Sequence, residues 1–154
     1  MFPYRRLLDE VAKLGLPNPG EVVLTYGTAM VTRGLRDEDT DTDIDIVTSL
    51  RNRQFLLRER GFHAVTVPVN TGDSPVIRDV YGRYDVWPWA FSHELDTRTG
   101  NGRIQLPELY GLSDQDQETG IWVASLELIR LTKLQTGRQK DIDDVALIDT
   151  YLNQ

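Results

Sequence analysis

Two aspartates, Asp43 and Asp45, stand two positions apart in the segment Asp43-Ile44-Asp45-Ile46-Val47. This alternation with apolar residues is typical of a strand, and it places both carboxylates on one face, about 6 to 7 Å apart. Carboxylates this close repel each other unless a cation compensates them, and hard divalent ions prefer oxygen ligands. A metal-binding pair is therefore one hypothesis; an acidic strand end solvated at the rim of a sheet is the other.

A possible phosphate cradle precedes this pair, at Tyr26-Gly27-Thr28. The apolar run before it predicts a strand, so these residues mark a strand-to-helix junction. Glycine allows the backbone to approach a phosphate closely, while the Thr28 hydroxyl and the helix N-terminal amides can donate hydrogen bonds. The alternative is an ordinary helix start.

A third acid, Asp85, follows the pair inside the otherwise apolar strand pattern Tyr84-Asp85-Val86-Trp87. Burying an unpaired carboxylate is costly, so we expect a cation or hydrogen-bond donors beside it, unless it faces water on an edge strand. Trp87 shares its face by alternation and could stack on a base or an acceptor ring, although a core tryptophan is the common case.

Hydrophobic periodicity predicts the elements that position these residues. Ser125 is the expected N-cap of one C-terminal helix, and Ile142, Val145, Ala146, Ile148 and Leu152 form the expected inner face of the last. We expect helices over about 7–16, 28–35, 51–60, 126–136 and 139–152, and strands over 22–26, 44–47, 62–69, 76–80 and 84–89, with a further short strand at 103–106.

The order of these elements predicts an α/β or α+β domain with a small mixed β-sheet flanked by helices and closed by two C-terminal helices. With 154 residues, 40% of them apolar, the chain has the size and composition of a single domain over 1–154. Its core is expected at about 21–90 and its C-terminal helical pair at about 125–152.

Composition narrows the classes of function. The chain has no cysteine, which removes thiol catalysis and zinc thiolate sites and agrees with a cytoplasmic location. Its net charge of -7 disfavours broad nucleic-acid binding and anionic membranes. No apolar run approaches the roughly 20 residues of a membrane span. Six acids crowd the segment 37–45, namely Asp37, Glu38, Asp39, Asp41, Asp43 and Asp45.

The combined motifs resemble the small bacterial nucleotidyltransferases of the superfamily related to DNA polymerase beta, in its minimal, toxin-like or drug-modifying branches. The residues that carry the resemblance are Tyr26-Gly27-Thr28-Ala29-Met30, Gly34-Leu35-Arg36, Thr42-Asp43-Ile44-Asp45-Ile46-Val47, Tyr84-Asp85-Val86, Leu128-Ile129-Arg130-Leu131-Thr132-Lys133-Leu134 and Gly137-Arg138-Gln139-Lys140-Asp141-Ile142-Asp143-Asp144.

The resemblance implies a set of site residues. Asp43 and Asp45 would hold two Mg²⁺ ions, for which Mn²⁺ could substitute, and Asp85 would be the third metal ligand and a proton acceptor. Gly27 and Thr28 would bind phosphates, and Arg36 and Lys133 would offset triphosphate charge. Lys133 could equally be a cation favoured at a helix C-terminus. Lys140, Asp141 and Asp144 are most simply explained as residues around a helix N-terminus, where acids are stabilising.

The implied activity is transfer of a nucleoside monophosphate from a nucleoside triphosphate to a hydroxyl or phosphate acceptor, with release of pyrophosphate. The acceptor could be a small molecule such as an antibiotic, a tRNA or a protein. A catalytically inactive nucleotide-binding or partner-binding module, for example in a toxin-antitoxin pair, is the alternative. Partners would then include a cognate antitoxin or a second copy of the chain.

Overall fold

Seven strands form one mixed sheet in the order β3-β4-β5-β2-β1-β9-β8, as the computed structural model shows for residues 2–37, 43–69, 72–91, 102–136 and 138–154. Strand β2 runs parallel to β5 and antiparallel to β1, which is parallel to β9. The strands are β1 (Val22–Leu24), β2 (Ile44–Thr48), β3 (His63–Val69), β4 (Gly72–Arg78), β5 (Tyr84–Trp87), β8 (Ser113–Gln115) and β9 (Trp122–Ala124). A separate ribbon pairs β6 (Ala90–Phe91) with β7 (Arg103–Ile104).

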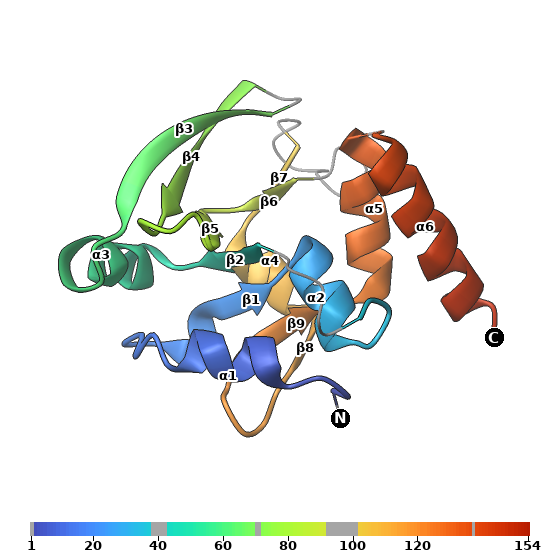
Figure 1. Ribbon diagram of the computed structural model, residues 1–154, viewed down its shortest axis with the longest axis horizontal. Helices are drawn as coiled ribbons and strands as arrows, with labels where there is room; N and C mark the ends of the chain where they lie inside the picture. Colours follow the sequence, from blue (N-terminus) through green and yellow to red (C-terminus); the bar gives the residue numbers. More distant parts are fainter. Residues whose placement is uncertain (1, 38–42, 70–71, 92–101, 137) are drawn as a thin grey trace.

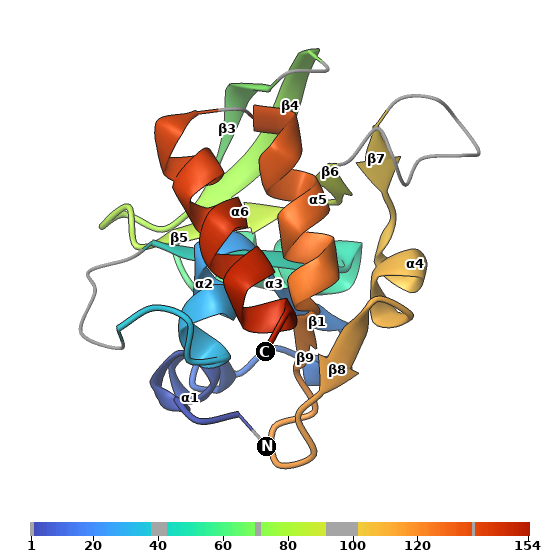
Figure 2. The same cartoon turned by 90° about the vertical axis from the view of Figure 1, so that its right-hand side faces the viewer.

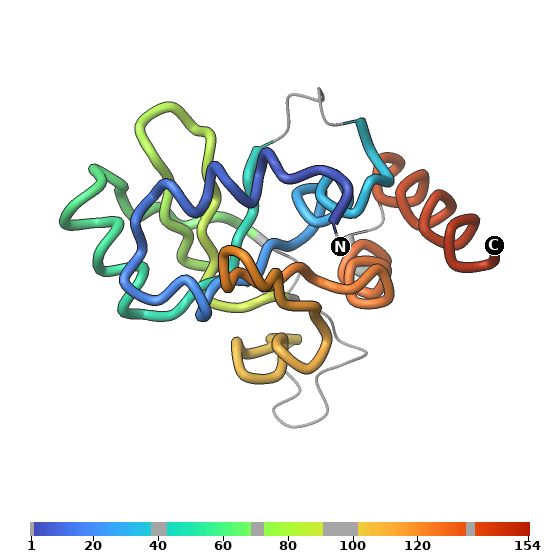
Figure 3. The backbone as a smooth tube through the Cα atoms, turned by 90° about the horizontal axis from the view of Figure 1, so that it is seen from below, coloured from blue at the N-terminus to red at the C-terminus, as the bar shows by residue number. Residues whose placement is uncertain are grey.

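Six helices surround the sheet in the described part of the chain: α1 (Arg6–Ala12), α2 (Tyr26–Thr32), α3 (Leu50–Glu59), α4 (Leu106–Tyr110), α5 (Leu126–Thr136) and α6 (Gln139–Leu152). A single 3₁₀ turn, η1 (Pro19–Glu21), leads into β1. Helices α5 and α6 lie side by side at the opposite end of the molecule from α3 (Figures 1 and 3). Figure 2 shows this pair in front of α2, and α5 contacts α2 directly. No described helix has the length and apolarity needed to cross a membrane.

Short apolar runs build the centre of the sheet. All three residues of β1 are buried, as are Ile44, Ile46 and Val47 of β2. A central strand covered on both faces excludes water from both sets of alternating side chains, so such runs stay apolar throughout. Within β2, Asp45 breaks this rule, so its carboxylate needs hydrogen bonds or a cation beside it.

The predicted α+β architecture with a mixed sheet and two C-terminal helices is confirmed. Ser125 caps α5 as expected, since its Oγ accepts a hydrogen bond from the Leu128 amide at 3.2 Å. The strands predicted at 76–80 and 84–89 pair as an antiparallel hairpin, β4 with β5, in which Arg78 lies opposite Asp85. By contrast, α4, β8 and β9 lie where the sequence pattern was weak and were not predicted, although β9 joins the main sheet beside β1.

The expected inner face of α6 was right at Ile148, which is buried, and Val145 is half-buried, but the other three residues are exposed. Ile142 is 54% exposed and Leu152 40% exposed, and Ala146 is exposed as well. The side chains that α6 buries are Asp141, Asp144 and Ile148, at helical spacing. Basic side chains on neighbouring elements pair with these two acids, so ion pairing has displaced the hydrophobic pattern on the inner face.

Candidate functional site

Asp43 and Asp45 lie at the start of β2, where α2 holds the strand in place. The Thr28 hydroxyl accepts a hydrogen bond from the Asp45 amide at 2.8 Å and donates to the Asp43 carbonyl at 3.2 Å. Thr28 is completely buried, so this hydroxyl fixes the aspartate pair against the first turn of α2. Phosphate binding by Gly27 and Thr28 stays a prediction, and it would use their backbone amides, which lack intrahelical partners in a first turn.

Asp85 stands beside Asp45 on the neighbouring strand. The parallel pairing of β2 with β5 places Asp45 opposite Asp85, and the antiparallel pairing of β4 with β5 places Arg78 opposite Asp85. Residues opposite each other in adjacent strands project from the same face. The Arg78 Nε atom donates to Asp85 Oδ1 at 2.6 Å. The predicted third acid is thus next to the pair, and it already has a cationic partner.

Two aromatic rings flank the carboxylates. The Trp87 indole Nε1 donates to Asp45 Oδ1 at 3.2 Å, and its ring is tilted against that of Tyr26 with centroids 6.4 Å apart. Tyr26 has a φ of 49°, which costs a non-glycine residue about 1 kcal/mol or more. Such strain persists where surrounding structure imposes it, and here it occurs at the junction from β1 to α2, next to Gly27.

Burial raises the pKa of the Asp45 carboxyl to about 7 from an ordinary value of 3.8. The hydrogen bond from Trp87 opposes this change, the negative charges of Asp85 and Asp43 add to it, and the charge of Lys133 opposes it. Near neutral pH, therefore, the protein without a bound cation keeps a large fraction of Asp45 protonated. A cation or positively charged group arriving at this site would favour the ionised form.

Because the pKa of Asp45 is raised on folding, the free energy of unfolding of the metal-free protein should fall as the pH rises from about 4 to about 7. The folded protein retains a proton there that the unfolded chain has released. Asp45→Asn should abolish this pH dependence, which we expect to lower the unfolding free energy of the wild-type protein by roughly 2 to 4 kcal/mol across the range. Urea unfolding of both proteins across this range checks the prediction, and parallel stability curves would contradict it.

Trp87→Phe should raise the pKa of Asp45 further, because the substitution removes the indole donor and keeps an aromatic ring. The ¹³C chemical shift of the Asp45 carboxyl, followed through a pH titration by NMR, measures this directly. Trp122→Phe is the matched control, since the Trp122 indole donates to the Gly20 carbonyl and not to the site. An unchanged midpoint in Trp87→Phe would show that the hydrogen bond does not tune this carboxylate.

A cluster of charged residues joins α5, α6 and the segment that follows α2. The Lys133 Nζ atom lies 2.7 Å from Asp144 Oδ2 and 3.6 Å from Asp141 Oδ1. Arg36 Nη2 contacts the same Asp144 oxygen, and Arg138 Nε donates to Asp141 Oδ2 at 2.8 Å. We call these five residues the clamp cluster: Arg36, Lys133, Arg138, Asp141 and Asp144.

The clamp cluster combines buried and exposed charges. Lys133, Asp141 and Asp144 are each at most 6% exposed, whereas the Arg138 side chain is 70% exposed. Burial acts to raise the pKa of Asp144, but hydrogen bonds from Arg36 and Lys133 outweigh it and hold the pKa below its ordinary value. The pKa of Arg138 is raised chiefly by its hydrogen bond to Asp141, with the charge of Asp45 as the smallest contribution. The cluster therefore lies close enough to the aspartate site to interact with it electrostatically.

The donor chemistry fits a divalent cation at Asp43 and Asp45. Both residues offer carboxylate oxygens at the start of β2, and a bound cation would favour the ionised form of Asp45, whose pKa is raised chiefly by burial. Within the described residues, however, no three His, Cys, Asp or Glu side chains are grouped closely enough to hold a metal ion. Asp85 is paired with Arg78, so its role as third ligand stays a prediction.

The structure thus brings most of the predicted residues into two neighbouring groups. One contains Asp43, Asp45, Asp85, Gly27, Thr28 and Trp87; the other contains Arg36 and Lys133. Sequence reasoning missed Arg78 and did not give Asp141 and Asp144 a functional role. Their spacing of three on a helix, facing a lysine on the preceding helix, was the available indication. Glu38, Asp39 and Asp41 of the acidic segment fall outside the described residues, as do His93 and Gly137.

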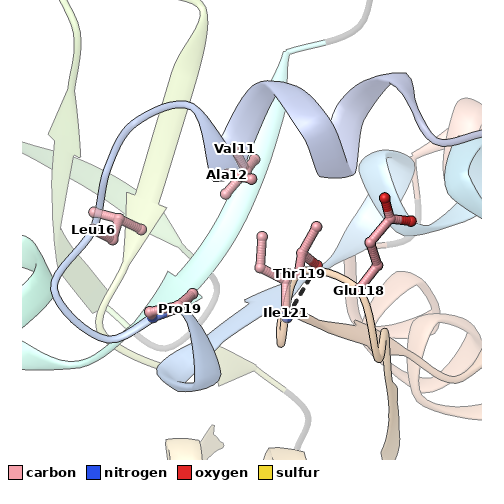
Figure 4. A pocket seen from close by; sticks show the side chains of 7 residues that line it. All are labelled: Val11, Ala12, Leu16, Pro19, Glu118, Thr119 and Ile121. Carbon is pink, nitrogen blue, oxygen red and sulfur yellow. Dashed lines mark hydrogen bonds between the residues drawn. The ribbon is translucent and has the colours of Figure 1, made fainter.

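A cavity of about 350 Å³ lies elsewhere, between α1, η1 and the turn before β9 (Figure 4). Val11, Ala12, Leu16, Pro19 and Ile121 give it a mainly apolar lining, completed by Glu118 and Thr119. Its polar groups are engaged: Thr119 Oγ1 donates to Asp116 and accepts from the Ile121 amide, and Glu118 pairs with Arg5. None of the candidate site residues lines this cavity.

No protein-family model matches the sequence, and no curated protein matches it. A solved structure matches the fold of this chain. The chain is similar to the antibiotic-resistance factor ANT(2'')-Ia, an aminoglycoside nucleotidyltransferase whose solution structure shows substrate-regulated conformation dynamics. The TM-score is 0.52 and the identity 16%, over 95% of this chain and 80% of that chain. At this identity the similarity establishes the fold.

Proposed function

We propose that this protein is a metal-dependent nucleotidyltransferase that transfers a nucleoside monophosphate from a nucleoside triphosphate to a hydroxyl or phosphate acceptor. One observation carries the proposal: Asp45, two residues after Asp43, is in register with Asp85 on the neighbouring strand, within the electrostatic influence of Lys133 from the clamp cluster. Carboxylates for a metal and cations for a triphosphate are the two requirements of phosphoryl-group chemistry.

Each group of residues has a role in the reaction. Asp43 and Asp45 would hold Mg²⁺, which when bound supplies positive charge to the phosphates and to the attacking oxygen. Lys133 and Arg36 would bind the β and γ phosphates, with the Gly27 and Thr28 amides as further donors. Trp87 offers an indole ring beside Asp45 for a base or an acceptor ring to stack on.

The chemical step needs a proton acceptor and a stabilised leaving group. The acceptor hydroxyl oxygen forms a bond to the α-phosphorus while the bond from that phosphorus to the β-phosphate bridging oxygen breaks. Asp85 takes the hydroxyl proton, and its hydrogen bond from Arg78 fixes the carboxylate orientation for this transfer. The pyrophosphate leaves with its negative charge opposite Lys133 and Arg36.

A transfer assay tests the proposal. The protein is incubated with Mg²⁺ and each α-³²P-labelled nucleoside triphosphate in turn, with an aminoglycoside panel, bulk tRNA or the protein itself as acceptor. We expect label on one acceptor class, pyrophosphate in equal amount, and neither product in Asp43→Asn. Label transfer that Asp43→Asn leaves unchanged would contradict the assignment of the site.

The Arg78–Asp85 ion pair favours a second candidate, a module that binds nucleotide without turnover. A carboxylate oxygen that is engaged by a guanidinium is less accessible to a metal ion or a substrate hydroxyl than a free one. In that case the transfer assay gives no product although nucleotide binds, and Arg78→Gln, which releases Asp85, should create or raise turnover. A fully active wild-type protein excludes this candidate.

A further inference from the structure

The carboxylate of Asp144 contacts two cations of the clamp cluster, an arrangement that the proposed function does not explain. Asp144 Oδ2 accepts from Lys133 Nζ at 2.7 Å and from Arg36 Nη2 at the same time. One oxygen atom thus brings together two cations from α5 and from the segment after α2. Without that oxygen the two like charges would repel each other, and Arg36, on a non-helical segment, would be free to turn away.

The second acid of the cluster orients the same lysine. Asp141 Oδ1 lies 3.6 Å from Lys133 Nζ, and Asp141 is also held by two contacts from Arg138, at 2.8 and 3.3 Å. Lys133 is therefore fixed between two buried carboxylates on one helix. The five side chains of the cluster carry three positive and two negative formal charges.

A glycine helps to set the path of the chain that carries Arg36. Gly34 has a φ of 84°, and a Cβ added there would lie 2.9 Å from the Pro3 ring. A side chain is therefore disfavoured at this position both by the backbone conformation and by the close contact. The backbone of the turn after α2 is therefore restricted at Gly34, and two residues later Arg36 contacts Asp144.

We propose that Asp144 is a positioning residue: it bridges Lys133 and Arg36 into a two-cation clamp for the phosphates of a polyphosphate. This inference rests on the proposed function, in which these two cations bind the triphosphate. Asp144 itself contacts no substrate. It acts through Lys133 and Arg36, because the orientation of both depends on the oxygen that they share.

Positioning and simple electrostatics make opposite predictions for Asp144→Asn. Removing a negative charge beside the clamp should strengthen anion binding if only net charge matters. If Asp144 holds the clamp together, the same change should weaken anion binding, because the two cations separate. Asp143 provides the matched control, since it is exposed on the same helix and lies outside the cluster.

The experiment measures the Kd of inorganic tripolyphosphate by calorimetry in saturating Mg²⁺. We expect Asp144→Asn to bind roughly tenfold more weakly than Asp143→Asn, which carries the same net charge. We also expect Asp144→Glu, which keeps the charge but moves the carboxylate by one methylene, to bind at least about threefold more weakly than Asp143→Glu. The glutamate variant keeps the test decisive if the asparagine variant does not fold.

Equal or tighter binding in the Asp144 variants would overturn the positioning role while leaving the proposed function intact. Failure of the wild-type protein to bind tripolyphosphate or any nucleoside triphosphate would instead contradict the proposed function, and this inference with it. A purely structural role of Asp144 would lower the unfolding free energy of its variants. The Kd of each Asp144 variant would then equal that of the matching Asp143 variant at a temperature where both are fully folded.

Discussion

Asp45→Asn is expected to reduce kcat for nucleotidyl transfer by roughly 10³-fold while the protein stays folded. The substitution removes one of the two carboxylates that would hold Mg²⁺, and several kcal/mol of transition-state stabilisation depend on that ion. Initial rates of pyrophosphate release, measured with the acceptor that the transfer assay identifies, give the effect. Asp45 is partly buried and carries a raised pKa, so the neutral amide should not destabilise the metal-free fold.

Asp143→Asn is the control for this activity measurement, because it makes the same chemical change at an exposed position of α6. It should retain the wild-type rate. The combination of lost activity and retained or increased stability in Asp45→Asn would distinguish a functional acid from a structural one. A wild-type rate in Asp45→Asn would show that Asp45 has no role in catalysis.

Lys133→Met should have the largest effect on stability, a loss of about 3 kcal/mol in the free energy of unfolding. Methionine preserves the length and apolar volume of the lysine stem, so packing changes little. The loss arises because Asp144 and Asp141 stay buried with one fewer cation between them. Urea denaturation followed by circular dichroism measures it, and tripolyphosphate binding should weaken in the same variant.

Lys140→Met serves as the comparison for Lys133→Met. Lys140 is exposed in the first turn of α6 and loses the same charge. We expect a change below about 0.5 kcal/mol for this surface substitution. A similarly small change for Lys133→Met would show that the buried cluster contributes little to stability and that its acids find other partners.

The sequence was sufficient to predict the helices and strands that show a clear local hydrophobic pattern. Apolar runs placed β1 and β2, and the acid pair in β2 stood out because charge inside a buried strand is costly. Ser125 and the apolar period after it placed α5. The strand predicted at 103–106 corresponds to β7, but the segment from 107 to 124 gave no comparable periodicity, because α4 has five residues and β8 and β9 have three each, too few to show a repeat.

The candidate site was harder to predict wherever the partner of a side chain depends on how distant segments pack together. Arg78 meets Asp85 only because β4 and β5 pair in one particular register, which local pattern does not specify. The inner face of α6 was assigned to its apolar residues, yet ion pairs with Lys133 and Arg36 bury Asp141 and Asp144 there. A hydrophobic pattern cannot reveal such a face, because the cations that compensate the acids lie on other segments, one of them, Arg36, more than a hundred positions from Asp144.

The most direct test of the central claim is a calorimetric titration of the protein with each of the four nucleoside triphosphates, with and without Mg²⁺. We expect saturable binding of at least one of them that depends on Mg²⁺, is lost in Asp45→Asn and is weakened in Lys133→Met. No heat with any of the four, or binding that neither Mg²⁺ nor Asp45→Asn affects, would contradict the assignment of Asp43, Asp45 and Lys133 to a magnesium-nucleotide site.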